Sequence, residues 1–180
     1  MQRYAELLTG VGRVRSFDYP YMQRPARKAP DKLDALIAAH REELTRLRAE
    51  SEASDRLLLA GKSMGGRVGC HLALEAPVSG CICFGYPLRG QNGKLRDQVL
   101  LDLRVPVLFI QGTRDALCDL QELEAVRGRM TTRSELYVVE SGDHSLEATK
   151  TSLKARGVTQ AQVEQEILNA VRRFCASLVA

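Results

Sequence analysis

Residues 57–69, with the sequence LLLAGKSMGGRVG, contain two overlapping patterns that belong to different chemistries. The Gly-Lys-Ser at positions 61–63 matches the end of a phosphate-binding loop, and residues 61–65 match the G-x-S-x-G turn that presents a nucleophilic serine. The phosphate loop needs a further glycine five positions before Gly61 to begin the backbone nest around the anion. That position is Arg56, so we favour the nucleophilic serine.

Ser63 lies between an apolar run and a glycine-rich segment that is typical of a strand followed by a helix. In such a turn the serine hydroxyl projects above the carboxyl end of a parallel sheet. Gly61 and Gly65 are expected to leave room for the sharp turn, and Gly66 to let the helix pack closely. We expect the backbone N–H of Met64 to bind an oxyanion, because it directly follows the nucleophile at a helix start.

A nucleophilic serine needs a general base, and the chain has three histidines: His40, His71 and His144. His40 falls on the apolar face of an expected helix, where a packed histidine is usual. His71 lies on the same expected helix as Ser63, about 12 Å further along its axis, which is too far to share a proton. His144 is in the loop after the last expected strand, so we predict it to be the base.

Three aspartates could orient the base, and Asp115 is the one we favour. It follows an apolar run and gives the chain order Ser63, Asp115, His144 that is found in α/β-hydrolases. Asp119 and Asp143 remain alternatives. We expect Asp119 to begin a helix and Asp143, which adjoins the base, to be a turn residue.

These residues require a framework in which several strands end at one edge. Short runs rich in Val, Ile and Leu alternate with amphipathic helical patterns, which predicts a mainly parallel sheet covered by helices on both faces, a three-layer α/β sandwich. Thr159 and Gln162 form an expected capping box for the last helix. The expected strands are 14–17, 56–60, 80–84, 105–110 and 135–139, and the expected helices are 2–10, 30–50, 64–75, a short helix before 105, 119–128 and one after 159.

The composition is that of an ordinary globular protein, with 180 residues of which 44% are hydrophobic and 27% charged, and we predict a single domain over residues 1–180. The odd number of cysteines, five, predicts reduced buried thiols in a cytoplasmic protein rather than a disulfide framework. A zinc site is a weak alternative because the spacing of its candidate ligands fits no common pattern. Those candidates are Cys70, His71, Cys81 and Cys83.

Residues 1–30 carry the whole net charge of +4, which could attract acidic partners. The basic residues are dispersed among aromatic residues and prolines, and no nucleic-acid-binding motif accompanies them, so we expect a solvated surface that does not bind nucleic acid. No apolar run is long enough to span a membrane, and we expect no membrane association.

Five segments give the chain its resemblance to a known family: FDYPYM, GKSMGGR, GYPL…GKLR, LFIQGTRD and GDHS. In this order, from about Gly10 to about Phe174, they resemble the small α/β-hydrolases of the testis-expressed protein 30 and dienelactone-hydrolase-like type. The resemblance implies an α/β-hydrolase fold and Ser63, Asp115 and His144 as a catalytic triad. This branch is also related to a non-enzymatic subunit of a chromatin complex.

In relatives, a segment resembling HGAG supplies a second oxyanion donor, and it precedes the part that corresponds to LLTGVGRVRSFDYPYM. Here QRYAELLTG at the beginning of the sequence has the pattern of the helix after that loop. The resemblance therefore implies an N-terminally shortened fold without the second donor. An exposed sheet edge would then favour a homo-oligomer.

The leading hypothesis is a serine hydrolase that cleaves a small ester or thioester without a cofactor or metal. The loop of residues 85–96 is expected to border the substrate pocket, with Tyr86 and Leu88 as walls. Arg89 is a candidate contact for a substrate carboxylate, although a solvated loop charge is the interpretation we favour for it. The alternative hypothesis is a non-catalytic α/β-hydrolase-like module that binds a protein partner through the basic N-terminal edge or the sheet edge.

Overall fold

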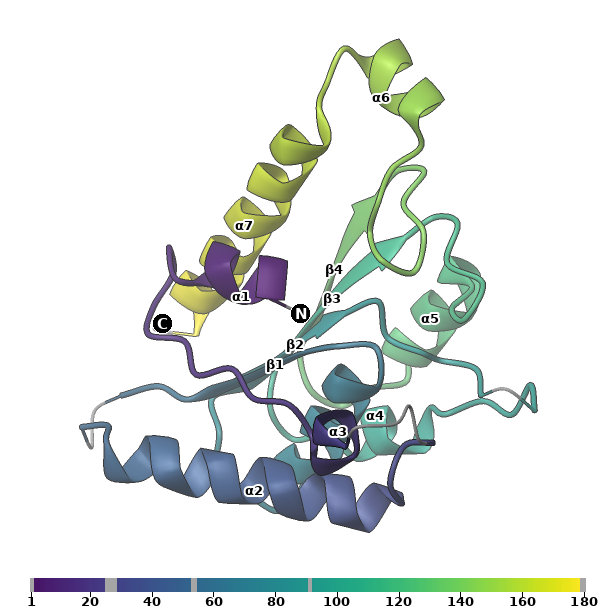
Figure 1. The fold of residues 1–180 in the computed structure, drawn as a ribbon. Helices are drawn as coiled ribbons and strands as arrows, with labels where there is room; N and C mark the ends of the chain where they lie inside the picture. The colour runs from purple at the N-terminus through teal and green to yellow at the C-terminus, as the bar shows by residue number, and fades with distance from the viewer. Residues whose placement is uncertain (1, 25–28, 53–54, 91, 179–180) are drawn as a thin grey trace.

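The fold is built around a four-stranded parallel sheet (Figure 1). The computed structural model describes residues 2–24, 29–52, 55–90 and 92–178. Neighbouring strands in the sheet are also neighbours in the sequence, and their hydrogen-bonded register places Leu58 opposite Gly80 and Val107 opposite Ser134. Because all pairs are parallel, the four strands end at one edge. They are β1 (Leu58–Lys62), β2 (Gly80–Phe84), β3 (Val107–Gly112) and β4 (Ser134–Val139).

Both faces of the sheet are buried, which explains why the central strands are continuous apolar runs rather than alternating ones. In β3, Val107 and Phe109 belong to one hydrophobic core, and Leu108 and Ile110 belong to a second core on the opposite face. The same alternation divides the residues of β2 between the two cores. Successive side chains of a strand point to opposite faces, so each run contributes to two separate cores.

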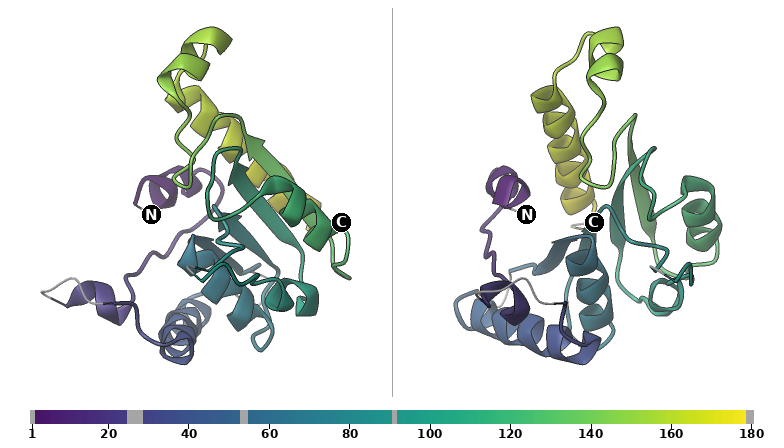
Figure 2. Two further views of the ribbon diagram at one scale, coloured as in Figure 1. Left: turned by 90° about the vertical axis from the view of Figure 1, so that its right-hand side faces the viewer. Right: turned by 45° about the vertical axis from the view of Figure 1, so that its right-hand side comes forward.

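One face of the sheet carries two layers of helix. Helix α3 (Met64–Ala73) packs directly on β1 and β2, and α2 (Leu33–Ala49) packs against the outer side of α3 (Figures 1 and 2). The shorter helices α4 (Gln98–Asp102) and α5 (Leu120–Arg127) contribute their apolar residues to the same core.

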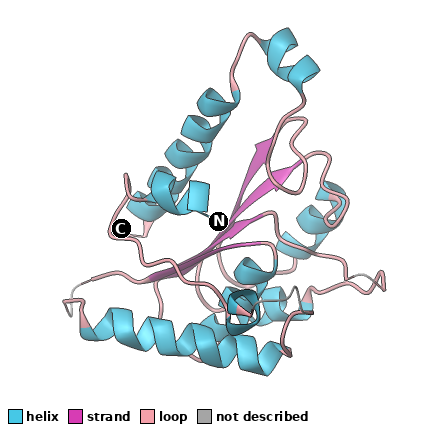
Figure 3. Ribbon diagram, in the orientation of Figure 1, coloured by secondary structure: helices cyan, strands magenta, loops and turns pink. Residues whose placement is uncertain are grey.

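The opposite face is covered by α1 (Gln2–Leu8) and α7 (Gln160–Ser177). Thr159 caps α7 through the expected capping box with Gln162, and the buried residues Val163, Ile167 and Val171 recur at the helical period. Figure 3 shows the helices and strands by colour. Two small helices lie outside this pattern: η1 (Pro20–Gln23) and α6 (Lys150–Arg156), neither of which has a buried residue.

The predicted fold class is confirmed, and the predicted elements differ from the structure in several places. Residues 14–17 form no strand, because Phe17 packs against Tyr19 and His40 rather than joining the sheet. Pro30 precedes the helix it was expected to begin, since α2 starts at Leu33. Helix α6 was not predicted.

No helix in the described part of the chain has the length and apolar character needed to cross a bilayer.

Candidate active site

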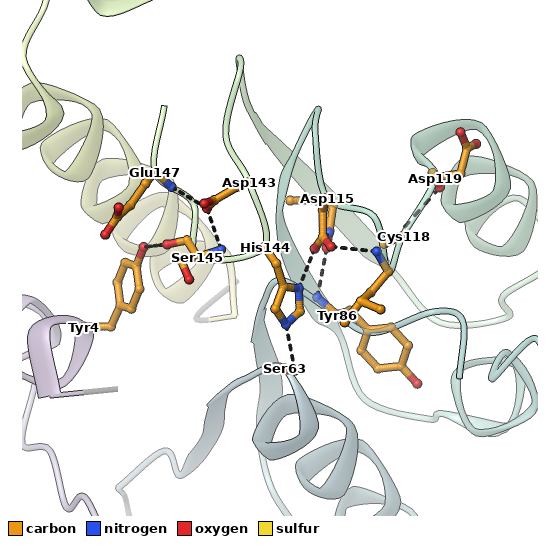
Figure 4. A network of polar contacts seen from close by, with 12 residues as sticks. Tyr4, Ser63, Tyr86, Asp115, Cys118, Asp119, Asp143, His144, Ser145 and Glu147 are labelled. Carbon is orange, nitrogen blue, oxygen red and sulfur yellow. Dashed lines mark hydrogen bonds and ion pairs between the residues drawn. The ribbon is translucent and has the colours of Figure 1, made fainter. Parts of the chain in front are cut away.

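Three side chains with the chemistry of a hydrolase meet at the edge where the strands end (Figure 4). Ser63 follows β1, Asp115 follows β3, and His144 lies in the loop after β4. The sheet therefore brings together residues that are far apart in the sequence, as expected where parallel strands share a carboxyl edge.

The backbone of Ser63 is strained. It has φ of 53° and ψ of −121°, a region that residues with a side chain rarely adopt, and it is the N-cap of α3 without using its own hydroxyl as a cap. A Cβ at Gly61 would lie 2.3 Å from the carbonyl carbon of Gly65, so this turn requires glycine at position 61. A Cβ at position 65 would have no neighbouring atom within 4 Å. The expectation that the turn needs glycine at this position for steric reasons is therefore wrong.

The three side chains form a continuous hydrogen-bond relay. His144 Nδ1 lies 2.8 Å from Asp115 Oδ2, and His144 Nε2 lies 2.8 Å from Ser63 Oγ. An ionised carboxylate can only accept, so Nδ1 carries the proton and donates to it. Nε2 is then the acceptor for the Ser63 hydroxyl, which is the tautomer that a general base requires.

The Asp115 carboxylate is enclosed and fully hydrogen-bonded. Its side chain is 0% exposed, whereas the His144 side chain is 28% exposed. Oδ1 accepts from Leu117 N–H at 2.9 Å, and Oδ2 accepts from the side-chain amide of Gln111 as well as from His144. A buried carboxylate with this set of donors is held in one orientation.

The two alternative carboxylates have structural roles. Asp119 is the N-cap of α5, and its carboxylate accepts from Gln121 N–H and Glu122 N–H. Asp143 accepts from Ser145 N–H at 2.7 Å and from a second backbone N–H in the same loop, so it shapes the turn that carries His144 (Figure 4). Among the three aspartates, Asp115 is the one that contacts the imidazole.

The loop that carries His144 is fixed by contacts to two other elements. Tyr4 of α1 donates from its hydroxyl to the carbonyl of Ser145 at 3.0 Å, and burial raises the pKa of Tyr4 to about 12, so the phenol stays a donor. After β2, Gly85 has φ of 61°, and a Cβ there would lie 2.8 Å from the carbonyl oxygen of His144. Glycine at this position lets the loop approach the sheet.

The start of α3 offers backbone donors next to the serine. The Arg67 N–H donates to the carbonyl of Ser63 at 3.2 Å, which begins the helical hydrogen bonds. In the part of the chain that the structure describes, no backbone carbonyl accepts from Met64 N–H. This N–H and the helix dipole provide a partial positive charge beside Ser63 Oγ.

The structure corrects the expected pocket walls. Tyr86 and Leu88 are both 0% exposed, and Tyr86 packs edge-on against Phe109 in the core. These residues are buried because the loop after β2 turns inward to continue the apolar core, so neither lines an open pocket. Arg89 differs from these two residues: it lines a cavity together with Asp115, and its half-exposed guanidinium donates to the Glu122 carboxylate.

The cysteines are buried or half-buried thiols. Cys118 is the cysteine nearest the site, and burial, followed by the neighbouring Asp115 carboxylate, raises its pKa to about 12, so the thiol is neutral and a poor nucleophile. Cys70 Sγ and Cys83 Sγ are 3.6 Å apart between α3 and β2. Within the described ranges, no three side chains of metal-ligating type converge on one point.

The basic N-terminal edge is largely neutralised within the fold. Arg13 and Arg15 both form ion pairs with Glu50, and Arg24 pairs with Asp31. Exposed pairs of this kind contribute little stability, but they reduce the positive charge offered to a partner. Arg27 and Lys28, which add to the same charge, lie outside the described residues.

Gln111 is a residue of the site that the sequence analysis missed. It is fully buried at the end of β3 and hydrogen-bonded to Asp115. A signal was available, because this glutamine follows an unbroken apolar run in the segment LFIQGTRD. A polar residue at such a position must be satisfied by specific partners.

Comparison with known proteins gives one family and a consistent group of solved structures. The alpha/beta hydrolase domain family matches residues 1–176. A protein of unknown function from Agrobacterium tumefaciens is similar over 98% of this chain and 78% of its own, with 15% identity and a TM-score of 0.69. A monoacylglycerol lipase from Paleococcus ferrophilus is similar over 98% and 90%, with 13% identity and a TM-score of 0.72.

A homologue of alpha-beta serine hydrolases from Coxiella burnetii is similar over 84% of this chain, with 16% identity and a TM-score of 0.60. This chain covers 64% of that protein, which is less than two thirds of its length. At these levels of identity the similarities establish the shared fold.

Proposed function

Because the chain belongs to the alpha/beta hydrolase domain family, we propose that it is a serine hydrolase in which Ser63 attacks the acyl carbon of a small ester or thioester. The observation that carries the proposal is the relay from Ser63 Oγ through both ring nitrogens of His144 to the buried Asp115 carboxylate. A serine hydroxyl is a weak nucleophile, and a base at hydrogen-bond distance is what activates it.

In the proposed mechanism Ser63 Oγ forms a bond to the acyl carbon while its proton passes to His144 Nε2. The carbonyl oxygen becomes an oxyanion. When the carbonyl re-forms, the bond from the acyl carbon to the leaving oxygen or sulfur breaks, and His144 donates the proton to the departing alcohol or thiol. Asp115 stabilises the transient imidazolium and preserves the tautomer. Water, activated by the same histidine, hydrolyses the acyl-enzyme and regenerates Ser63.

The backbone supports this role for Ser63. The positive φ between a strand and a helix is the geometry of a nucleophile elbow, which keeps the hydroxyl exposed at the sheet edge. We assign the Met64 N–H as an oxyanion donor, because it is the first N–H of α3 after the nucleophile. Such donors act on the charge that develops in the transition state.

The substrate class is proposed from the chemistry of the site and from the family. A serine, a histidine and a carboxylate in this relay carry out acyl transfer, and the similar solved structures include a monoacylglycerol lipase. The alternative of a non-catalytic interaction module gains no support from the N-terminal edge, where the described arginines Arg3, Arg13, Arg15 and Arg24 are paired with carboxylates.

Hydrolysis of p-nitrophenyl acetate and butyrate, and of a short acyl thioester followed by thiol release, tests the proposal. We expect turnover by the wild type, and a loss of about 10⁵-fold or more in kcat for Ser63→Ala. Ser145→Ala is the matched control, since Ser145 adjoins the base but its hydroxyl is not part of the relay, and we expect it to retain wild-type turnover. Folded protein without Ser63-dependent turnover would refute the hydrolase assignment and favour the interaction module.

A further inference from the structure

Gln111 is a fully buried polar side chain at the end of an otherwise apolar strand. The four preceding residues of β3, at positions 107–110, are Val, Leu, Phe and Ile, and all belong to the two hydrophobic cores. A buried amide is compatible with a folded core only when its donor and acceptor atoms are hydrogen-bonded. The partners of Gln111 therefore indicate why an amide occupies this position.

The amide joins the loop after β2 to the orienting carboxylate. Gln111 Oε1 accepts from Tyr86 N–H at 2.9 Å, and Gln111 Nε2 donates to Asp115 Oδ2 at 2.5 Å. These partners fix the orientation of the amide, because a backbone N–H can only donate and an ionised carboxylate can only accept. The donor group of Gln111 therefore faces the same oxygen that accepts the hydrogen bond from His144 Nδ1.

Removing that donor would loosen Asp115 in a specific way. Oδ1 is held by Leu117 N–H, but Oδ2 is held by Gln111 and His144 together. The terminal torsion of an aspartate is broad, so the carboxylate orientation is set by its hydrogen-bond partners rather than by its rotamer. Without the amide, the partner that remains on Oδ2 is the imidazole that this oxygen has to orient.

We propose that Gln111 is a positioning residue of the hydrolase site, whose amide fixes the Asp115 carboxylate in the orientation that directs His144 toward Ser63. This inference rests on the proposed function, because a carboxylate needs a fixed orientation only if the imidazole acts as a base. A neutral donor suits the position, since a cation there would compete with the imidazolium for the same carboxylate.

Gln111→Met removes the donor that faces Asp115 without introducing a charge, and its unbranched side chain is similar in length. It also removes the acceptor for Tyr86 N–H. Gln160→Met is the matched control, because Gln160 also bridges two groups: it accepts from Ala148 N–H at 3.0 Å and donates to the Leu146 carbonyl at 3.1 Å. The control loses the same pair of hydrogen bonds, but its donor faces a carbonyl rather than the orienting carboxylate.

We expect a defect in kcat for Gln111→Met. Loss of the donor to Asp115 should lower kcat about 10- to 100-fold with KM nearly unchanged, the loss expected for one charge-assisted hydrogen bond. Gln160→Met is expected to remain within about threefold of wild type.

A readout that does not depend on turnover separates this inference from the proposed function. The proton between His144 Nδ1 and Asp115 should give a downfield resonance in ¹H NMR, to be assigned by its loss in His144→Gln. At pH 8 we expect it at the wild-type position in Gln160→Met and shifted or broadened in Gln111→Met. An unshifted resonance, or equal kcat of the two variants at pH 8, would overturn the role of Gln111, whereas absence of Ser63-dependent turnover in the wild type would overturn the proposed function alone.

Discussion

Two histidines in this molecule contact a hydroxyl, and they lie in different surroundings. His144, at the carboxyl edge of the sheet, contacts Ser63 Oγ at 2.8 Å, and His40 of α2 contacts Tyr19 Oη through Nδ1 at 3.2 Å. The other ring nitrogen of His144 faces the Asp115 carboxylate. In the described part of the chain, His40 forms no ion pair with a carboxylate, and its ring lies 5.1 Å from that of Phe17.

A contact between a hydroxyl and an imidazole is not enough to make a catalytic site, as the surroundings of His40 show. Burial lowers the pKa of His40 to about 4, so this ring has little tendency to accept a proton. Tyr19 also has ordinary extended backbone, with φ of −62° and ψ of 152°, whereas Ser63 has a positive φ. The carboxylate and the strained turn, rather than the hydroxyl contact, distinguish the site at the sheet edge.

The largest expected effect separates the two histidines by activity. His144→Gln should lower kcat for p-nitrophenyl acetate by about 10⁵-fold or more, because it removes the base, while His40→Gln should leave kcat within about threefold of wild type. Steady-state kinetics at pH 7.5 on both folded variants provides the measurement. Comparable losses of kcat in the two variants would show that the surroundings of His144 and His40 do not separate a catalytic histidine from a structural one.

The second prediction concerns the turn that presents Ser63. Gly61→Ala should destabilise the protein by several kcal/mol, on the order of 3 to 5, or prevent folding, because its Cβ would overlap the backbone of α3. Gly65→Ala should fold normally, since its Cβ enters open space. Urea unfolding of the two variants tests the contrast, and similar destabilisation by both would mean that the turn is not held by close approach at Gly61.

The third and smallest effect is the pH dependence of stability contributed by His40. Its pKa is about 4 in the fold against 6.5 ordinarily, so the unfolded chain binds a proton at mildly acidic pH that the folded chain does not. Stability from this group is fully present above pH 6.5 and is lost as pH falls toward 4, by up to about 3 kcal/mol.

His40→Gln removes that proton linkage. Urea unfolding between pH 7 and pH 4.5 should show a smaller decline in unfolding free energy for the variant than for the wild type. Parallel declines would mean that folding does not change the pKa of His40.

Much of the fold could be predicted from the sequence because both faces of the sheet are buried. Continuous apolar runs identified β2 without error and β1, β3 and β4 to within two residues. Residues 14–17 were misassigned because a short run with Phe17 fits an aromatic cluster on α2 as well as a strand. Periodicity alone does not distinguish those two packing environments.

The three residues of the hydrogen-bond relay could be predicted from the sequence, whereas the residues packed around them could not. Ser63, Asp115 and His144 were identified because their loops follow expected strands, and the structure brings the three together. Tyr86 and Leu88 were expected beside a pocket, but the path of a loop depends on packing that its sequence does not reveal. Gln111 was missed because its partners, Tyr86 N–H and Asp115, are adjacent only in three dimensions.

The central claim is that Ser63 is activated through His144, and its most direct test is the intact mass of the protein after fluorophosphonate treatment. The wild type, Ser63→Ala, His144→Gln and His40→Gln should be treated in parallel. We predict a single adduct on the wild type and on His40→Gln, none on Ser63→Ala, and labelling of His144→Gln that is slower by about 1,000-fold or more. Labelling of His144→Gln at the wild-type rate, or of Ser63→Ala at all, would contradict the claim.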